Sequence, residues 1–182
     1  LFANVESMIF NCRFNSLSWV VVGNIYTCQP VIIVTETKSV LESVEGNHVV
    51  GKTNEDVEGI SVVNGNFNII PKNIDKFFPN LSFIQWIGTG LTSISVEDLR
   101  PFQRLRVLAL WDNELTQIDS DLFDYTPNIE YINIRNNSIE YVGAEAFDDL
   151  RKLTTLNFDG NVCFSGRATN RSAVLKLTTP VS

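Results

Sequence analysis

Apolar residues recur along this chain at a fixed interval of 24 positions. Residues 81–86, 105–110 and 129–134 carry apolar side chains at matching places, and a further segment of the same kind begins at Leu153. Self-similarity at a period of this length is typical of a solenoid, in which each coil buries its apolar face against its neighbours. The pattern therefore predicts a stack of similar coils with one continuous core.

Numbering each unit from 1 to 24, starting at Leu81, aligns the repeated positions in columns. Columns 1, 4, 6, 11 and 14 are apolar in almost every unit, and column 9 holds Asn113, Asn137 and Asn161. This is the L-x-x-L-x-L-x-x-N-x-L spacing of leucine-rich repeats. Columns 4 and 6 point to one face of a strand, so Leu108 and Ile132 should be buried. We expect parallel strands at residues 59–63, 83–87, 107–111, 131–135 and 155–159.

The expected fold is an α/β leucine-rich repeat solenoid with an N-terminal β cap. A curved parallel sheet forms its concave face, and short helices or turns form its convex face. An inward asparagine in column 9 can donate and accept hydrogen bonds where the chain turns away from the strand. Thr89 can partly replace this asparagine, whereas Gly65 supplies no side chain. The unit that begins at Val57 is therefore read as a divergent coil.

The first 40 residues do not fit the repeat and are read as strands, with a turn at Gly23-Asn24. We expect a small β cap clamped by a Cys12–Cys28 disulfide, whose loop of about 15 residues contributes about 3 kcal/mol. The alternative is two buried free thiols in a cytosolic protein. Residues 41–46 indicate a shorter, irregular coil. Three segments result: a cap with this first coil at 1–56, the repeats at 57–162, and a C-terminal cap or tail at 163–182.

Cys163 lies in column 11 of the last unit, where the repeat stops. It is interpreted first as the opening cysteine of a truncated C-terminal cap, second as a buried thiol, and third as an intermolecular bridge. Residues 172–177 predict a short capping helix. The chain begins at Leu1 without a visible signal peptide, so we expect a mature or trimmed form.

The charge balance argues against two classes of partner. The formal net charge is -7, whereas nucleic-acid binding needs a basic stripe and a lipid anchor needs a polybasic segment. No apolar run approaches the ~18 residues of a membrane-spanning helix. The sequons at Asn80, Asn136 and Asn170, together with the cysteine pair, favour a secreted, extracellular glycoprotein.

The sequence offers no catalytic constellation. Its one histidine, His48, lies in a turn-rich segment and is expected to bond a backbone group rather than to serve in a catalytic triad. No glycine-rich phosphate loop follows a strand, and no cysteine pair has metal-ligand spacing. Acidic residues after column 14, such as Asp98, are expected to cap short helical turns on the convex side. We therefore expect no enzymatic activity and no catalytic, cofactor or metal site.

Columns 3, 5 and 7 alternate with the buried columns and should point outward from the sheet. They predict a partner-binding patch with the following members: Phe83, Gln85, Ile87, Val107, Trp111, Tyr131, Asn133 and Arg135. Aromatic residues and arginine are enriched in binding hot spots, and a contiguous apolar patch is typical of an interaction site. The alternative is that these residue types serve sheet packing alone.

Several short motifs carry a resemblance to a known family. They are Cys12-x-Phe14, Tyr26-Thr27-Cys28, Gly46-Asn47-His48, Gly51-Lys52-x-Asn54, residues 77–81, Asp98-Leu99-x-Pro101-Phe102 and Asn161-Val162-Cys163. With the repeats, they resemble secreted leucine-rich repeat proteins of flies, midges and mosquitoes over nearly the whole chain. Related secreted repeat proteins include innate-immune recognition and receptor ectodomain modules. The family pattern usually has a later cysteine, which this chain lacks.

Two classes of function follow from these patterns. The first is a secreted recognition module that binds a protein, or less favourably a glycan, on its concave face. The second is a structural or assembly protein, for instance a homodimer linked through Cys163. Neither class calls for a cofactor, a nucleic acid or a membrane span.

Overall fold

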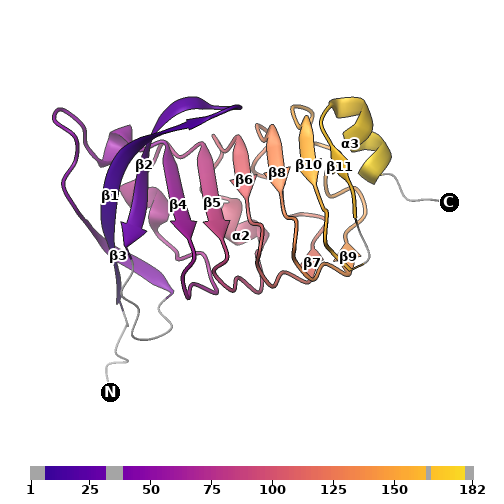
Figure 1. The fold of residues 1–182 in the computed structure, drawn as a ribbon, viewed down its shortest axis with the longest axis horizontal. Coiled ribbons are helices and arrows are strands. Elements are labelled where there is room, and N and C mark those ends of the chain that lie inside the picture. Colours follow the sequence, from indigo (N-terminus) through magenta and orange to yellow (C-terminus); the bar gives the residue numbers. More distant parts are fainter. Residues whose placement is uncertain (1–6, 32–38, 163–164, 179–182) are drawn as a thin grey trace, which may run out of the picture.

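The computed structural model describes residues 7–31, 39–162 and 165–178, and these residues form one elongated stack of coils (Figure 1). A nine-stranded sheet runs along the whole stack in this part of the chain, in the order β11-β10-β8-β6-β5-β4-β2-β1-β3. Its centre consists of the repeat strands β4 (Gly59–Val63), β5 (Phe83–Ile87), β6 (Val107–Ala109), β8 (Tyr131–Asn133) and β10 (Thr155–Asn157).

The repeat strands pair in parallel and in the register that the columns predict. Gly59 pairs with Phe83, Phe83 with Val107, Val107 with Tyr131, and Tyr131 with Thr155. The parallel sheet of the predicted solenoid is thereby confirmed. Leu108 and Ile132 are buried as expected.

The later strands are shorter than predicted, since β6, β8 and β10 all end at column 5. Column 5 is Ala109 in β6, whereas in the coils of β8 and β10 it is an asparagine that accepts a hydrogen bond from the backbone two residues further on. Arg135 N donates to Asn133 Oδ1 at 3.2 Å, and Asp159 N donates to Asn157 Oδ1 at 2.9 Å. These side chains bind the column-7 amides, which are then not offered to a neighbouring strand.

The column-9 asparagines point inward and join each coil to the one before it. Asn113 Oδ1 accepts from the backbone N of Leu91 at 3.1 Å, and its Nδ2 donates to the carbonyls of Trp86 at 2.7 Å and Leu110 at 3.0 Å. Asn137 Nδ2 donates to the same Leu110 carbonyl at 3.0 Å. Each of these buried polar groups is thus paired, which confirms the predicted role of the column.

Thr89 does not replace the asparagine in the way expected. Its Oγ1 donates to Asn113 Oδ1 at 2.9 Å, so it joins the following coil rather than the preceding one. The link to the preceding coil comes from column 6, where Trp86 Nε1 donates to the carbonyl of Phe67 at 3.1 Å. The indole thus donates to the preceding coil, as the column-9 asparagine does in later coils.

Column 8 has a distinctive backbone conformation that was not predicted from the sequence. Its residues all have a positive φ: Asn64 at 55°, Gly88 at 59°, Asp112 at 58°, Asn136 at 51° and Gly160 at 75°. Asparagine, aspartate and glycine are the residue types that tolerate this left-handed conformation. The column therefore makes the sharp turn by which every coil leaves the sheet at the same edge.

The N-terminal cap is a long hairpin joined to the first coil. β1 (Ser7–Trp19) and β2 (Gly23–Val31) are antiparallel, and β2 pairs in parallel with β4. The expected disulfide joins Cys12 to Cys28. Residues 41–46 were expected to form an irregular coil, and this is wrong. Most of them belong to β3 (Val40–Glu45), which pairs in parallel with β1 at the edge of the sheet.

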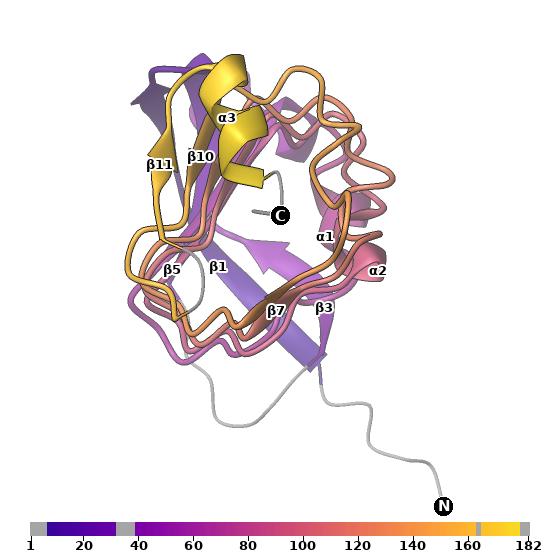
Figure 2. The ribbon, with the colours of Figure 1, turned by 90° about the vertical axis from the view of Figure 1, so that its right-hand side faces the viewer.

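The convex side carries short elements, as predicted (Figure 2). They are α1 (Ile74–Phe77), α2 (Val96–Leu99), β7 (Gln117–Ile118) and its partner β9 (Tyr141–Val142). The short helix η1 (Asn54–Asp56) comes just before β4 in the chain. Asp98 Oδ2 accepts from Ser95 N at 2.8 Å and from Ser95 Oγ at 2.7 Å, so this acidic residue does cap its helix. Among the described residues, no helix is long and apolar enough to span a membrane.

The C-terminal end of the stack is closed by β11 (Arg167–Ala168) and α3 (Arg171–Thr178). β11 is antiparallel to β10, and Val174 of α3 is fully buried in the common core. The predicted capping helix is therefore present. Cys163 lies outside the described residues, so its pairing remains a prediction, as do the boundaries of the three segments.

Asn137→Ala should destabilise the fold. The backbone N–H of Leu115 donates to Asn137 Oδ1 at 3.0 Å and would lose this partner in the core, and a buried polar group left without a hydrogen bond costs about 1–3 kcal/mol. Asn66→Ala, at an exposed position, is the control and should change the unfolding free energy by less than about 0.5 kcal/mol. Urea denaturation measures both. Equal midpoints for the two variants would show that the column is dispensable.

Candidate functional site

The tip of the β1–β2 hairpin lies over the concave face. β2 pairs with β4 at Thr27 and Cys28, so the residues before Thr27 extend past the beginning of the neighbouring strand. The indigo arrowhead of β1 lies on the side of the sheet that faces away from α1 and α2 (Figure 2). Ile25, Phe83 and Val107 form a separate apolar cluster there, with the tip packed around it.

Trp19, the last residue of β1, makes the main aromatic contacts of the tip. Its ring centroid lies 5.2 Å from that of Phe83 and 5.9 Å from that of Tyr131, both edge-on. It also stacks on Trp111, with the centroids 6.5 Å apart. These are favourable geometries for aromatic pairs, so Trp19 holds the tip against rings from three successive coils.

Gly59 makes room for this arrangement. A Cβ at this position would lie 2.9 Å from Ile25 Cδ1 and 3.1 Å from Phe83 Cδ1. Both side chains therefore occupy the space above the glycine. The glycine in column 3 therefore lets the hairpin and the sheet meet.

Arg106 adds a polar link between the sheet and the tip. Its Nη2 donates to the carbonyl of Val21 at 3.0 Å, and its Nε donates to Glu130 Oε1 at 2.7 Å. The hydrogen bond to Glu130 raises the pKa of the Arg106 guanidinium. The hydrogen bond to Glu130 fixes the orientation of the Arg106 side chain, so that its Nη2 faces the loop of the hairpin.

The predicted exposure of the patch is wrong for most of its residues. Five are buried on the concave face: Phe83, Gln85, Ile87, Val107 and Asn133. The hairpin covers the two column-3 residues Phe83 and Val107. Gln85 Oε1 accepts from Ser61 Oγ at 2.8 Å, so this amide is also engaged within the sheet.

The remaining predicted residues stay accessible. Trp111 and Tyr131 are half-buried, and Arg135 is exposed with its guanidinium carbon 5.9 Å from the centre of the Trp111 ring. Trp19, Trp111, Tyr131 and Arg135 together form what we name the aromatic site. It offers flat ring surfaces beside a positive charge, which suits contact with aromatic and acidic groups.

Trp19 was not among the predicted binding residues, although the sequence carries a signal for it. Ser16-Leu17-Ser18-Trp19 alternates polar and apolar residues, as a strand with one covered face does. The valines that follow it in the loop, residues 20–22, lie at the tip, and Val20 is fully exposed. An alternating strand that ends in an apolar loop indicates a hairpin whose tip packs one apolar face against another part of the protein.

A groove of about 590 Å³ runs beside the hairpin. It is lined by Val22, Ile25, Lys52, Glu55, Asp56, Glu58, Asn80, Ser82, Arg104 and Arg106. Its cations already have partners within the protein: Lys52 pairs with Asp56, and Arg104 donates to Asn80 Oδ1 at 2.7 Å. The groove therefore presents balanced charge rather than an anion site.

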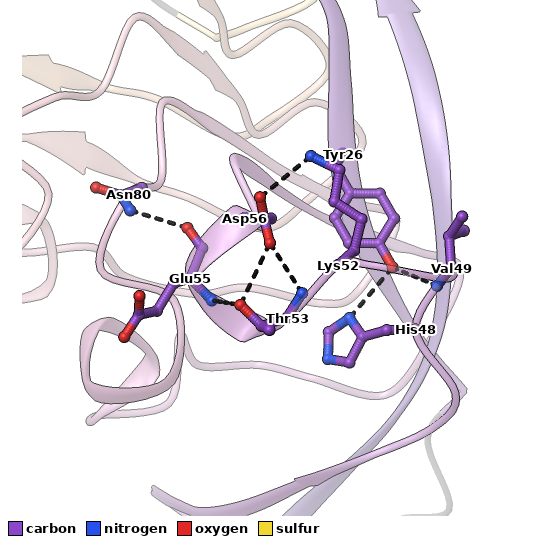
Figure 3. A network of polar contacts seen from close by, with 8 residues as sticks. All are labelled: Tyr26, His48, Val49, Lys52, Thr53, Glu55, Asp56 and Asn80. Atoms are coloured by element: carbon purple, nitrogen blue, oxygen red, sulfur yellow. Dashed lines mark hydrogen bonds and ion pairs between the residues drawn. The ribbon is translucent and has the colours of Figure 1, made fainter.

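His48 has a structural role near the cap (Figure 3). It stacks on Phe14 with centroids 3.8 Å apart, and its ring nitrogens lie 3.1 Å from Tyr26 Oη and 3.1 Å from Asn54 Oδ1. The Tyr26 hydroxyl also accepts from Val49 N at 3.0 Å. The expected backbone partner is therefore wrong, because the histidine bonds two side chains.

The cap loop beside His48 is closed by a second network (Figure 3). Asp56 Oδ2 accepts from Thr53 N at 2.9 Å, and Asp56 Oδ1 lies 3.1 Å from Lys52 Nζ. The Thr53 backbone hydrogen bond, followed by Lys52, lowers the pKa of Asp56. Among the described residues, no group of three or more His, Cys, Asp or Glu side chains is placed to hold a metal ion.

The three sequons differ in how their asparagines are engaged. Asn80 Nδ2 donates to the Glu55 carbonyl at 2.8 Å, and Asn136 Nδ2 donates to Asp112 Oδ1 at 2.7 Å. Asn170 is exposed, and its Oδ1 accepts from Ala173 N at 3.0 Å at the start of α3. Asn170 thus bonds through its side-chain oxygen, whereas Asn80 and Asn136 use the amide nitrogen, the atom to which a glycan is attached.

The geometry of the coils agrees with a comparison with known families. Residues 103–162 match the family model for leucine-rich repeats. The fold is a leucine-rich repeat solenoid. The narrower likeness to secreted insect proteins remains a prediction.

A solved structure shares this architecture. A chain in the Toll–Spatzle complex, described as a molecular hub in Drosophila development and innate immunity, superposes with a TM-score of 0.55 and 19% sequence identity. The match covers 66% of the present chain and 17% of that chain. At this identity the likeness concerns the fold alone, and the present chain spans a small part of its neighbour's length.

Gly59→Val should lift the hairpin tip from the sheet. The added side chain would occupy the space of Ile25 and Phe83, and overpacking of this kind costs about 1–3 kcal/mol. Trp19 would then lose its ring contacts, so the tryptophan emission should shift to longer wavelength. Thr155→Val, in the same column outside the tip's contacts, is the control. An unshifted emission in Gly59→Val would mean that the tip does not rest on this glycine.

Proposed function

We propose that this protein is a secreted recognition module that binds a protein partner through the accessible part of its concave face. The observation that carries the proposal is the aromatic site. Trp19, Trp111 and Tyr131 present partly exposed rings on the outer side of a rigid sheet, and Arg135 adds a positive charge. Tryptophan, tyrosine and arginine dominate the energetics of protein interfaces.

The rigidity of the stack supports this use of the surface. Trp111 and Tyr131 belong to repeat coils that the column-9 asparagines Asn113 and Asn137 join to the preceding coils. Binding then orders few side chains, and less conformational entropy is lost than on a mobile surface. The leucine-rich repeat fold is itself typically a protein-interaction scaffold rather than an enzyme.

The extracellular setting is part of the proposal. The Cys12–Cys28 disulfide supports it, because such bonds persist in oxidising compartments. The three sequons support it as well. A role in innate immunity is the narrower form of the proposal, and its support is the resemblance to secreted insect repeat proteins together with the shared fold of the Toll–Spatzle structure.

Trp111→Ala should weaken capture of the partner from the extracellular fluid of the source. Loss of a hot-spot residue costs about 2 kcal/mol or more, which corresponds to about 30-fold in affinity. Tyr141→Ala is the matched control, because Tyr141 is an exposed aromatic residue on β9. Equal recovery with both variants would place the binding surface outside the aromatic site.

The same experiment separates recognition from assembly. If the chain captured by the wild type is another copy of itself, and a non-reducing gel shows a covalent dimer, the structural alternative through Cys163 replaces the proposal. The melting temperatures of the variants are measured as well, so that loss of partner capture can be distinguished from loss of the folded structure.

Expression through a eukaryotic secretory pathway should place a glycan on Asn170. Its side chain is exposed, and it bonds the start of α3 through Oδ1 rather than through the amide nitrogen that carries a glycan. Ser172→Ala removes the sequon and keeps the capping asparagine. Intact mass spectrometry should show one glycan fewer in this variant than in the wild type. A wild-type mass equal to that of the bare polypeptide would contradict the secreted assignment.

A further inference from the structure

Trp19 occupies the concave face as a ligand would. Its ring is stacked on Trp111 and meets Phe83 and Tyr131 edge-on, yet the residue as a whole is only half-buried. Three rings from successive coils thus surround one indole that belongs to a different part of the chain. We call the space bounded by Phe83, Trp111 and Tyr131 the indole seat.

The hairpin tip that delivers Trp19 is attached to the sheet mostly through side chains. The strand pairing of β2 with β4 begins at Thr27. The loop at residues 20–22 has one hydrogen bond to the sheet among the described residues, from Arg106 to the Val21 carbonyl. Val20 at its end is fully exposed. The tip is therefore held against the repeat strands mainly by apolar side-chain contacts, which can open without breaking the pairing of β1 with β2 or of β2 with β4.

The base of the hairpin is fixed independently of the tip. Cys12 is bonded to Cys28, and both are buried in the common core. Phe14 and Tyr26 pack in the same core, beside the disulfide in the sequence. Opening of residues 17–25 would consequently leave the cap and the first coil intact.

We propose that the indole seat is an exchangeable site for an aromatic side chain of the protein partner, and that Trp19 is its intramolecular occupant. This inference rests on the proposed function and adds the chemistry of the partner. The partner presents an aromatic residue on an extended segment, as β1 presents Trp19. A ring of this kind is recognised by one stacked and two edge-on contacts.

Arg106 extends the recognition beyond the ring. It binds the backbone carbonyl two residues after Trp19, and Glu130 keeps it in place when that carbonyl leaves. The seat therefore selects an aromatic residue with a free carbonyl two positions later. Arg135, beside Trp111, favours an acidic residue next to that segment.

A tethered occupant also sets a threshold for binding. A group held on the same chain has an effective concentration in the millimolar range or higher, so a ligand must compete with it. The apparent affinity of a ligand equals its intrinsic affinity multiplied by the fraction of molecules in which the seat is empty. The hairpin thus makes the site selective against single aromatic side chains that lack the flanking contacts.

The test uses N-acetyl-L-tryptophanamide as the probe, measured by isothermal titration calorimetry. Trp19→Ala removes the occupant and should bind the probe at least about tenfold more tightly than the wild type, which equals about 1.4 kcal/mol. Trp19→Phe, which keeps a ring in the seat, is the matched control and should bind as weakly as the wild type. In a Trp19→Ala/Trp111→Ala double variant the binding should disappear.

Three results would overturn the inference. They are equal binding by wild type and Trp19→Ala, no binding by a Trp19→Ala protein with a cooperative melting transition, and undiminished binding by the double variant. If Trp19→Ala fails to fold, hydrogen exchange of the wild type decides. The amides of residues 17–25 should then exchange at least about tenfold faster than those of residues 26–31, as expected for local opening, and equal protection would refute an exchangeable tip.

The probe experiment needs no partner, so its outcome is separate from that of the capture experiment. A seat that binds the probe, with partner capture unaffected by Trp111→Ala, would reject the proposed function alone. Partner capture that depends on Trp111 while the seat rejects the probe would reject this inference alone.

Discussion

The structure depends on satisfying the backbone groups at the place where each coil turns away from the sheet. The stack buries the inward side of this turn, where Asn113 and Asn137 lie, so water cannot supply the missing hydrogen bonds there. The column-9 asparagine does so by donating to carbonyls of its own coil and the preceding one, as Asn113 does with Leu110 and Trp86. Because the Leu110 carbonyl also accepts from Asn137, neighbouring coils share these groups. This sharing fixes the register with which every outward column is aligned.

The aligned columns explain why a binding surface forms where it does. Strict register places Phe83, Val107 and Tyr131 on neighbouring strands in one row. A row of large side chains on an outer sheet face needs a cover or a partner, since apolar surface in water is unfavourable. The chain covers its first part with the hairpin tip and leaves the Trp111 and Arg135 side accessible. The site is therefore a boundary between an internal cover and an open face.

The sequence predicted what is periodic and local. The strands, the buried columns and the inward asparagines follow from the 24-residue spacing, because each depends on residues within one coil and its neighbour. It did not predict where the hairpin tip lies, because that depends on Gly59 and Phe83, residues far along the chain from Trp19. Thr89 was misjudged for a similar reason, since Trp86 in another column took over the inward hydrogen bond. Outward exposure was the weakest expectation, because alternation gives a direction and not the absence of a cover.

The hairpin consequently has two roles that place opposite requirements on its rigidity. As an end cap it must shield the open core of the first coil, which favours a rigid, disulfide-bonded element. As a cover for the concave face it must leave accessible rings at its tip, which favours weak attachment. The chain separates the roles along the hairpin: the Cys12–Cys28 bond and the pairing at Thr27 hold the base, whereas Trp19 and one arginine hydrogen bond hold the tip. A solenoid end can in this way stay closed while the face beside it exchanges its occupant.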